Sequence, residues 1–233
     1  MPTSRVPMDR IRALSSSGPQ REAEYVLYWM TSFRRLGWNH ALQRAVDWCV
    51  ELGKGLVILE ALRCDYPWAS HRFHRFVIDG MIEHGAALEG VAGVRYLPFI
   101  ESGPREGRGL LARLAGEAAA VVTDDFPTFF IPAMLSAATR HVSVTFEAVD
   151  SNGLLPMRAA DRAYPTAYAF RRFVQKTLPL HLADAPEPEP LSRLAGLSAP
   201  DVPESVAERW PAADLASGGP DLNGIPIDAG DGP

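Results

Sequence analysis

The chain has 233 residues, 47% of them hydrophobic and 22% charged, which is typical of a globular protein with one sizeable core. Its formal net charge of -5 excludes a strong whole-chain attraction to nucleic acid, so a DNA contact would need a local patch. No apolar run reaches the roughly 20 residues that span a bilayer, and the polar N-terminus has no apolar signal core. We expect a cytoplasmic protein without membrane contact, in which Cys49 and Cys64 are reduced thiols.

Short apolar runs alternate with helical patterns through most of the chain. The polar residues 1–21 are expected to form a disordered lead. Apolar runs bounded by turn residues then predict five buried strands. These strands are expected at residues 25–30, 56–62, 94–99, 119–123 and 142–149.

The segments between these strands carry helical signals. Asn39 and Ser70 stand as N-caps before apolar stripes, and Gly53 is expected to end the first of these helices. Shorter helices are predicted over 109–118, from Pro132 onward and over 166–177. The apolar stripe of the helix after Ser70 is expected to comprise Phe73, Phe76, Val77, Gly80, Met81, Ala87 and Leu88.

The strand–helix alternation predicts a Rossmann-like, doubly wound α/β fold: a five-stranded parallel sheet with helices on both faces. We assign residues 22–182 to this domain. Residues 183–233 are rich in Pro, Gly, Ala and Asp and show no sustained apolar period. They are expected to form an extended or disordered linker or tail.

Polar residues follow every predicted strand, at the edge where open parallel sheets bind ligands. This edge is either a ligand cleft or a set of ordinary solvated loops, and we favour the cleft. Asp124 and Asp125 point apart as neighbours, so one is expected to hold a loop while the other faces the cleft. The polar residues are Thr31, Ser32 and Arg34; Arg63 and Asp65; Glu101 and Ser102; Asp124 and Asp125; and Asp150, Ser151 and Asn152.

Recognised nucleotide-binding and catalytic motifs are missing from the sequence. There is no GxGxxG after the first strand, no P-loop and no Ser-His-Asp arrangement, so we assign no catalytic residue. Arg105 and Arg108 in a Gly-rich loop would suit an anion, but a flexible surface loop is the preferred interpretation. His71 and His74 are interpreted as a partly exposed pair, not a metal site. Core and edge packing, not an electron-transfer chain, is the preferred interpretation of Trp29, Trp38, Trp48 and Trp68.

Several segments resemble the photolyase/cryptochrome family. YVLYWM at 25–30, followed by Arg34 or Arg35 and by Asn39, Ala41 and Leu42, resembles its opening, and the YWM form is similar to class II cyclobutane-dimer photolyases. The other matching segments are VVTDDFP at 121–127, VDSNGLLP at 149–156, TAYAFRRFVQKTLPLHL at 166–182 and IPID at 225–228.

This resemblance implies a two-domain enzyme for light-dependent DNA repair. Its N-terminal α/β domain holds an antenna pigment, which is a deazaflavin, a folate or a flavin. Its C-terminal helical domain binds FAD and repairs a pyrimidine dimer flipped out of DNA. The pigment-binding residues that the resemblance transfers to this chain are Met30, Arg34, Asp124, Asp125 and Asn152; Arg34 and Asn39 are alternatively expected to fix the first loop.

Three functions are compatible with this resemblance. The first is the N-terminal antenna portion of a photolyase, inactive alone because the sequence ends before a helical FAD domain. The second is a free-standing flavin- or nucleotide-binding photoreceptor or accessory module. The third is a docking domain for a separate FAD-binding domain, which uses the basic face of Arg171, Arg172 and Lys176. In each case damaged DNA would be contacted only through the FAD domain.

Overall fold

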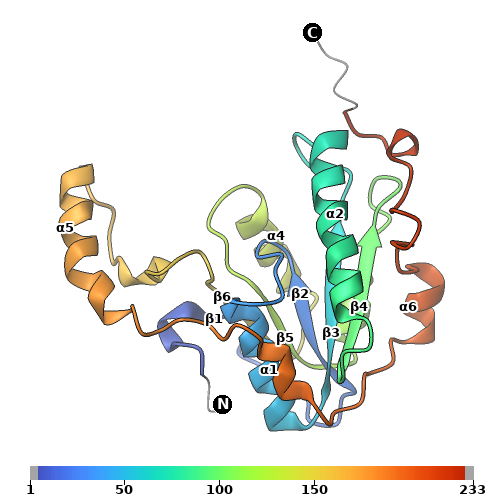
Figure 1. Cartoon of the computed structure of the whole chain (residues 1–233), viewed down its shortest axis with the longest axis horizontal. Coiled ribbons are helices and arrows are strands. Elements are labelled where there is room, and N and C mark those ends of the chain that lie inside the picture. The colour runs from blue at the N-terminus through green and yellow to red at the C-terminus, as the bar shows by residue number, and fades with distance from the viewer. Residues whose placement is uncertain (1–4, 229–233) are drawn as a thin grey trace.

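A computed structural model describes residues 5–228 and contains one six-stranded sheet in the order β1-β6-β5-β2-β3-β4 (Figure 1). Strands β2 to β6 are parallel to their neighbours, whereas β1 runs antiparallel to β6. The strands are β1 (Ile11–Ala13), β2 (Tyr25–Met30), β3 (Gly55–Leu62), β4 (Val94–Ile100), β5 (Ala118–Asp124) and β6 (Thr145–Val149). The predicted Rossmann-like α/β fold is therefore confirmed.

Helices cover both faces of the sheet because the central strands are apolar on both sides. In β2, Tyr25, Leu27 and Trp29 face one core, while the alternate residues face the other. The first core is closed by α3 (Leu110–Ala115), α4 (Ile131–Ala138) and α6 (Glu204–Arg209). The second is closed by α1 (His40–Leu52) and α2 (His71–Leu88). Within residues 5–228, no helix is both long and apolar enough to cross a bilayer.

The expected helix caps are present. Asn39 Oδ1 accepts hydrogen bonds from the N–H groups of Ala41 and Leu42, and Ser70 Oγ accepts one from Phe73 N. Helix α1 ends at Gly53, whose left-handed φ of 65° suits glycine. These local signals were readable in the sequence because each cap bonds within three residues of itself.

The sheet has six strands instead of the predicted five, because part of the N-terminal segment is ordered. Within the expected disordered lead, Ile11–Ala13 form β1 and pair with Val149, Ala148 and Glu147 of β6. Arg10, just before β1, is buried and donates hydrogen bonds to the carbonyls of Gly153 and Leu154. A three-residue edge strand carries too short a pattern to be recognised from sequence.

The buried face of α2 differs from the predicted stripe. Phe73 and Phe76 are 54% and 78% exposed, whereas Ile78, Met81 and Leu88 are buried. Helix α2 thus has two apolar faces, and the aliphatic one packs on the sheet. The prediction was right for Met81 and Leu88 but wrong for Phe73 and Phe76, because periodicity alone does not rank two faces that both contain apolar residues.

The segment after residue 183, described as far as residue 228, packs against the domain instead of being a disordered tail. Leu194, Val206, Trp210 and Ile225 are all at least 95% buried. Trp210 Nε1 also donates a hydrogen bond of 2.8 Å to the carbonyl of Glu106. The segment contains only short helical turns and one short helix, α6, so its anchoring comes from isolated side chains.

Helix α5 (Ala167–Thr177) projects away from the sheet (Figure 1). Thr166 caps it, because its Oγ1 accepts a hydrogen bond from Ala169 N. None of its side chains is buried, although it carries several aromatic residues. This helix is therefore not part of the core.

Candidate functional site

Two adjoining cavities lie at the carboxyl ends of β2, β3 and β4, beneath α3 and α4. Their volumes are about 370 and 220 Å³. Both are lined by Trp29, Ala61, Leu62, Arg63 and Met134, so they share one wall. This edge is where the sequence predicts a ligand cleft, and it borders the β2/β5 boundary where strand order reverses.

The walls of the larger cavity are mainly apolar. Trp29 is 8% exposed and has no side-chain hydrogen bond to any described residue. Leu59 and Phe99 come from β3 and β4, and Leu110 comes from α3. Flat apolar walls with an indole N–H suit a planar conjugated molecule better than a highly polar one.

Basic side chains surround these apolar walls. Arg63, Arg105, Arg108 and His141 line the larger cavity, against a single acidic residue, Glu101. Arg34 lines the smaller cavity together with Arg63. The charged side chains that line the two cavities are therefore mainly basic, although Arg34 and Arg63 are ion-paired with Glu60 and Asp65 and the chain as a whole is acidic.

A buried network fixes Arg34 beside the smaller cavity. Its guanidinium donates to Glu60 Oε1 at 2.7 Å and to the Ala61 carbonyl at 3.2 Å. Tyr96 OH donates to Glu60 Oε2 at 2.6 Å, and His84 Nδ1 lies 2.9 Å from the same oxygen. Burial alone raises the pKa of Glu60, but the His84 and Tyr96 hydrogen bonds and the Arg34 charge outweigh it, so the pKa lies below its ordinary value.

Glu101 shapes the loop after β4. Its Oε1 accepts a hydrogen bond from Gly107 N at 2.9 Å, and its Oε2 accepts one from Cys64 N at 3.2 Å. A Cβ at position 107 would lie 3.1 Å from both Glu101 Oε1 and Phe99, so this close approach favours glycine. The carboxylate thereby joins the loops that follow β3 and β4.

Asp124 holds the loop that follows β2. It is fully buried, and its Oδ2 accepts hydrogen bonds from the N–H groups of Thr31, Ser32 and Phe33 at 2.7–3.0 Å. Its Oδ1 accepts a hydrogen bond of 2.7 Å from Tyr28 OH. Through these four hydrogen bonds, the Asp124 carboxylate holds the loop in place.

Asp125 and Asn152 lie in a second polar cluster, around the ends of β1 and β6. Asp125 accepts two hydrogen bonds from the Arg12 guanidinium, at 2.9 and 2.5 Å. Asn152 donates to the Asp125 carbonyl and to Asp150 Oδ1. Neither residue lines the two cavities. One of the two neighbouring aspartates was expected to face the cleft, but Asp125 does not.

Of the five pigment-binding residues that the resemblance transfers, Arg34 lines a cavity. Met30 is fully buried in the core on the α1 face, away from both cavities. Asn39 Nδ2 donates to the Phe33 and Arg35 carbonyls, so Asn39 fixes the first loop as the alternative proposed. The sequence analysis did not place Arg105, Arg108 and Trp29 in the site, because these residues line one cavity only through the strand order of the folded sheet.

Exposed aromatic residues flank the smaller cavity on two loops. Trp68 and Phe129 are 74% and 73% exposed, and their rings meet edge to face at 6.4 Å. Both have left-handed backbones, with φ of 67° and 57°, which is strained for bulky residues. Trp38 is also exposed, so packing explains Trp29 and Trp48 but not Trp38 or Trp68.

His74 differs from the expected partly exposed pair. It is fully buried and stacks on Tyr66 with ring centroids 5.7 Å apart. No group of three metal-ligating side chains is found among residues 5–228.

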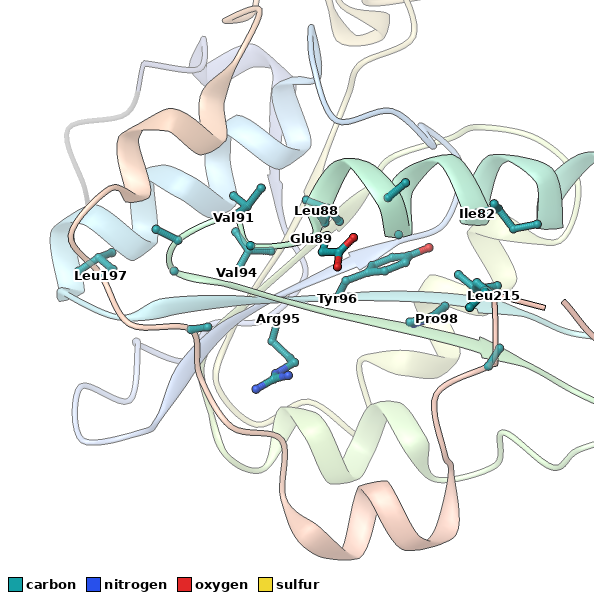
Figure 2. A pocket seen from close by; sticks show the side chains of 18 residues that line it. Ile82, Leu88, Glu89, Val91, Val94, Arg95, Tyr96, Pro98, Leu197 and Leu215 are labelled. Carbon is teal, nitrogen blue, oxygen red and sulfur yellow. The ribbon is translucent and has the colours of Figure 1, made fainter. Parts of the chain in front are cut away.

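A larger cavity, of about 910 Å³, lies elsewhere, between α2, β4 and the C-terminal segment (Figure 2). Its tyrosine, Tyr96, already donates its hydroxyl to Glu60. Tyr96 and Glu89 lie on the α2 side of β4, whereas Arg95 points to the other side (Figure 2) and donates to the Pro200 carbonyl. Because its polar groups do not converge, we place the candidate site at the carboxyl edge.

No family model matches the chain. It is similar to a deoxyribodipyrimidine photo-lyase of the archaeon Methanothermobacter thermautotrophicus (strain Delta H), with 30% identity over 171 residues. The matched region covers 73% of this chain and 37% of that protein. This similarity supports the relationship to photolyases that the sequence motifs indicate.

Proposed function

We propose that this chain is the N-terminal, pigment-binding part of a photolyase-like protein of the class II type. The observation that carries the proposal is the pair of adjoining cavities at the carboxyl edge of a Rossmann-like sheet, in a chain similar to a photolyase. The ligand is a flat conjugated pigment: a deazaflavin, a folate or a flavin.

The cavity walls support a planar ligand. Trp29, Phe99 and Met134 offer flat or adaptable apolar surface, and Trp29 offers an N–H donor. Arg34 is fixed by Glu60 and retains N–H groups that can reach a ring oxygen or nitrogen. The larger volume of about 370 Å³ lies within the usual range of ligand pockets.

In this proposal, light absorbed by the pigment serves a FAD-binding helical domain, and damaged DNA is contacted only by that domain. The chain spans 37% of the photo-lyase it matches. Because repair in this proposal depends on the FAD-binding domain, we expect no repair from this chain alone. Illumination with a dimer-bearing oligonucleotide tests this, and efficient repair by the isolated chain would overturn it.

Pigment binding is tested by titration with FMN, a deazaflavin and a folate, followed by absorption and fluorescence. Ala61 lines both cavities, so the larger side chain of Ala61→Phe should fill the space at their shared wall and weaken pigment binding at least about tenfold. Ala133→Phe, on the exposed side of α4, is the matched control and should bind as the wild type does. If none of the three pigments binds the wild type, the proposal fails.

Helix α5 favours a second candidate function, docking of a separate FAD-binding domain. Tyr164 and Phe173 stack at 5.0 Å, and Tyr168 is 67% exposed. Residues 167–177 include three basic residues and no acidic one, which suits a partner surface that is acidic and partly apolar.

Charge reversal tests this docking. Arg171→Glu with Arg172→Glu should weaken binding to a purified FAD-binding photolyase domain at least about tenfold in a pull-down or titration. Arg21→Glu with Lys54→Glu, remote from α5 in sequence and outside its surface, is the control for net charge. Equal binding by wild type and the α5 variant would exclude this surface.

A further inference from the structure

We propose that the larger carboxyl-edge cavity contains a phosphate-binding end formed by Arg63, Arg105 and Arg108, and that its ligand is a flat ring system carrying a phosphate group. This inference rests on the proposed function and specifies the chemical class of the ligand. The three arginines come from two loops, the ones that follow β3 and β4. They line the same cavity because β3 and β4 are neighbours in the sheet.

The guanidinium groups have unused donors. Neither the Arg105 nor the Arg108 side chain has a hydrogen-bond or ion-pair partner among the described residues, in a structure where most other arginines do. Arg63 donates to Asp65 through Nε and one Nη, which leaves its other terminal nitrogen available. Each free guanidinium presents a planar fork of donors that matches the oxygens of a phosphate.

The loop that carries Arg105 and Arg108 is held in a defined shape. Arg105 has a left-handed φ of 67°, an unfavourable conformation for a residue with a side chain. Gly107 N bonds to Glu101, and Trp210 Nε1 bonds to the Glu106 carbonyl, so the loop is tied at two successive residues. A strained conformation fixed from both sides is typical of ligand-binding loops.

Asp65 pairs with Arg63, so the excess positive charge of the cavity comes from Arg105 and Arg108, against the one carboxylate of Glu101. Glu101 is 3% exposed, and its two oxygens already accept hydrogen bonds from Gly107 N and Cys64 N. His141 also lines this cavity. A phosphate monoester, with a charge of about -1.5 to -2 near neutral pH, balances several cations better than a single carboxylate does.

Comparison of FMN with riboflavin isolates the phosphate, because the two share their ring and ribityl chain and differ only in that group. We expect FMN to bind at least about tenfold more tightly, which corresponds to about 1.4 kcal/mol. Arg105→Gln with Arg108→Gln should reduce this preference to within about threefold and leave the riboflavin Kd nearly unchanged. Arg171→Gln with Arg172→Gln makes the same change in net charge on α5 and should retain the preference.

Inorganic pyrophosphate provides a readout that does not depend on the ring. It should raise the melting temperature of the wild type and of the α5 control, but not that of the Arg105/Arg108 variant. Equal binding of FMN and riboflavin, without stabilisation by pyrophosphate, overturns the phosphate end while leaving pigment binding intact. If neither flavin binds and pyrophosphate has no effect, the phosphate end is also overturned, and the deazaflavin and folate titrations then decide the proposed function.

Discussion

Replacing Asp124 by Asn tests whether this residue acts as the internal anchor of the β2–α1 loop. The substitution keeps the side-chain shape but removes the negative charge to which three backbone N–H groups and Tyr28 OH donate hydrogen bonds. An amide NH₂ placed at Oδ2 would face the three N–H donors, and the flipped amide would lose the acceptor of the Tyr28 proton. Hydrogen bonds to charged groups contribute about 1.5–3 kcal/mol each and are not additive, so we expect a loss of about 3–5 kcal/mol.

Urea unfolding measures this loss. With an m-value of about 2 kcal/mol/M, the midpoint should fall by about 1.5–2.5 M while m stays unchanged. Asp65→Asn is the control, because Asp65 pairs with Arg63 near the surface and should cost less than about 1 kcal/mol. A midpoint shift below about 0.5 M for Asp124→Asn would refute the anchoring role.

Two further predictions concern burial. His40→Gln should reduce the pH dependence of stability. Burial, reinforced by the Arg10 charge, lowers the pKa of His40 to about 4, against about 6.5 in the unfolded chain. The stability that the neutral His40 contributes is therefore complete above about pH 6.5 and is lost as the pH falls toward about 4. Between pH 7 and pH 5 the wild type should lose about 1–2 kcal/mol more than the variant, as measured by urea unfolding, and equal losses would contradict the buried neutral state. Trp210→Ala should destabilise the chain by about 3–5 kcal/mol, whereas Leu182→Ala, on an exposed side chain, should change stability by less than about 0.5 kcal/mol; equal effects would show that the C-terminal segment is not anchored.

The central sheet could be predicted from sequence because its signals are local. Strand β2 was located to the residue, since Tyr25–Met30 is apolar throughout and must be buried on both faces. The Asn39 and Ser70 caps also act within their own turns. Strand β1 was missed because its stability comes from β6, more than 130 residues later in the chain.

The C-terminal segment shows the same limit. Leu194, Val206, Trp210 and Ile225 are isolated apolar residues in a Pro- and Gly-rich sequence, so no period distinguishes them from a linker. They are buried because surfaces of the domain are available to receive them. Those receiving surfaces exist only once the domain has folded, so a local sequence pattern cannot predict the burial of these four side chains.

The candidate site was predictable as an edge but not as a set of residues. Strand ends identified Arg34, Arg63, Glu101 and Asp124, yet the first three line the cavities and Asp124 is enclosed by backbone donors. These residues follow the strands, so the alternating side-chain directions of a strand no longer apply to them. Whether each one faces the cavity depends on the geometry of its loop.

The most direct test of the account is a crystal structure of the chain soaked with the pigment that binds best in titration. The account predicts ring density in contact with Trp29 and Met134, at the wall shared by the two carboxyl-edge cavities. Ring density in the α2–β4 cavity of Figure 2, with the carboxyl edge empty, would contradict it.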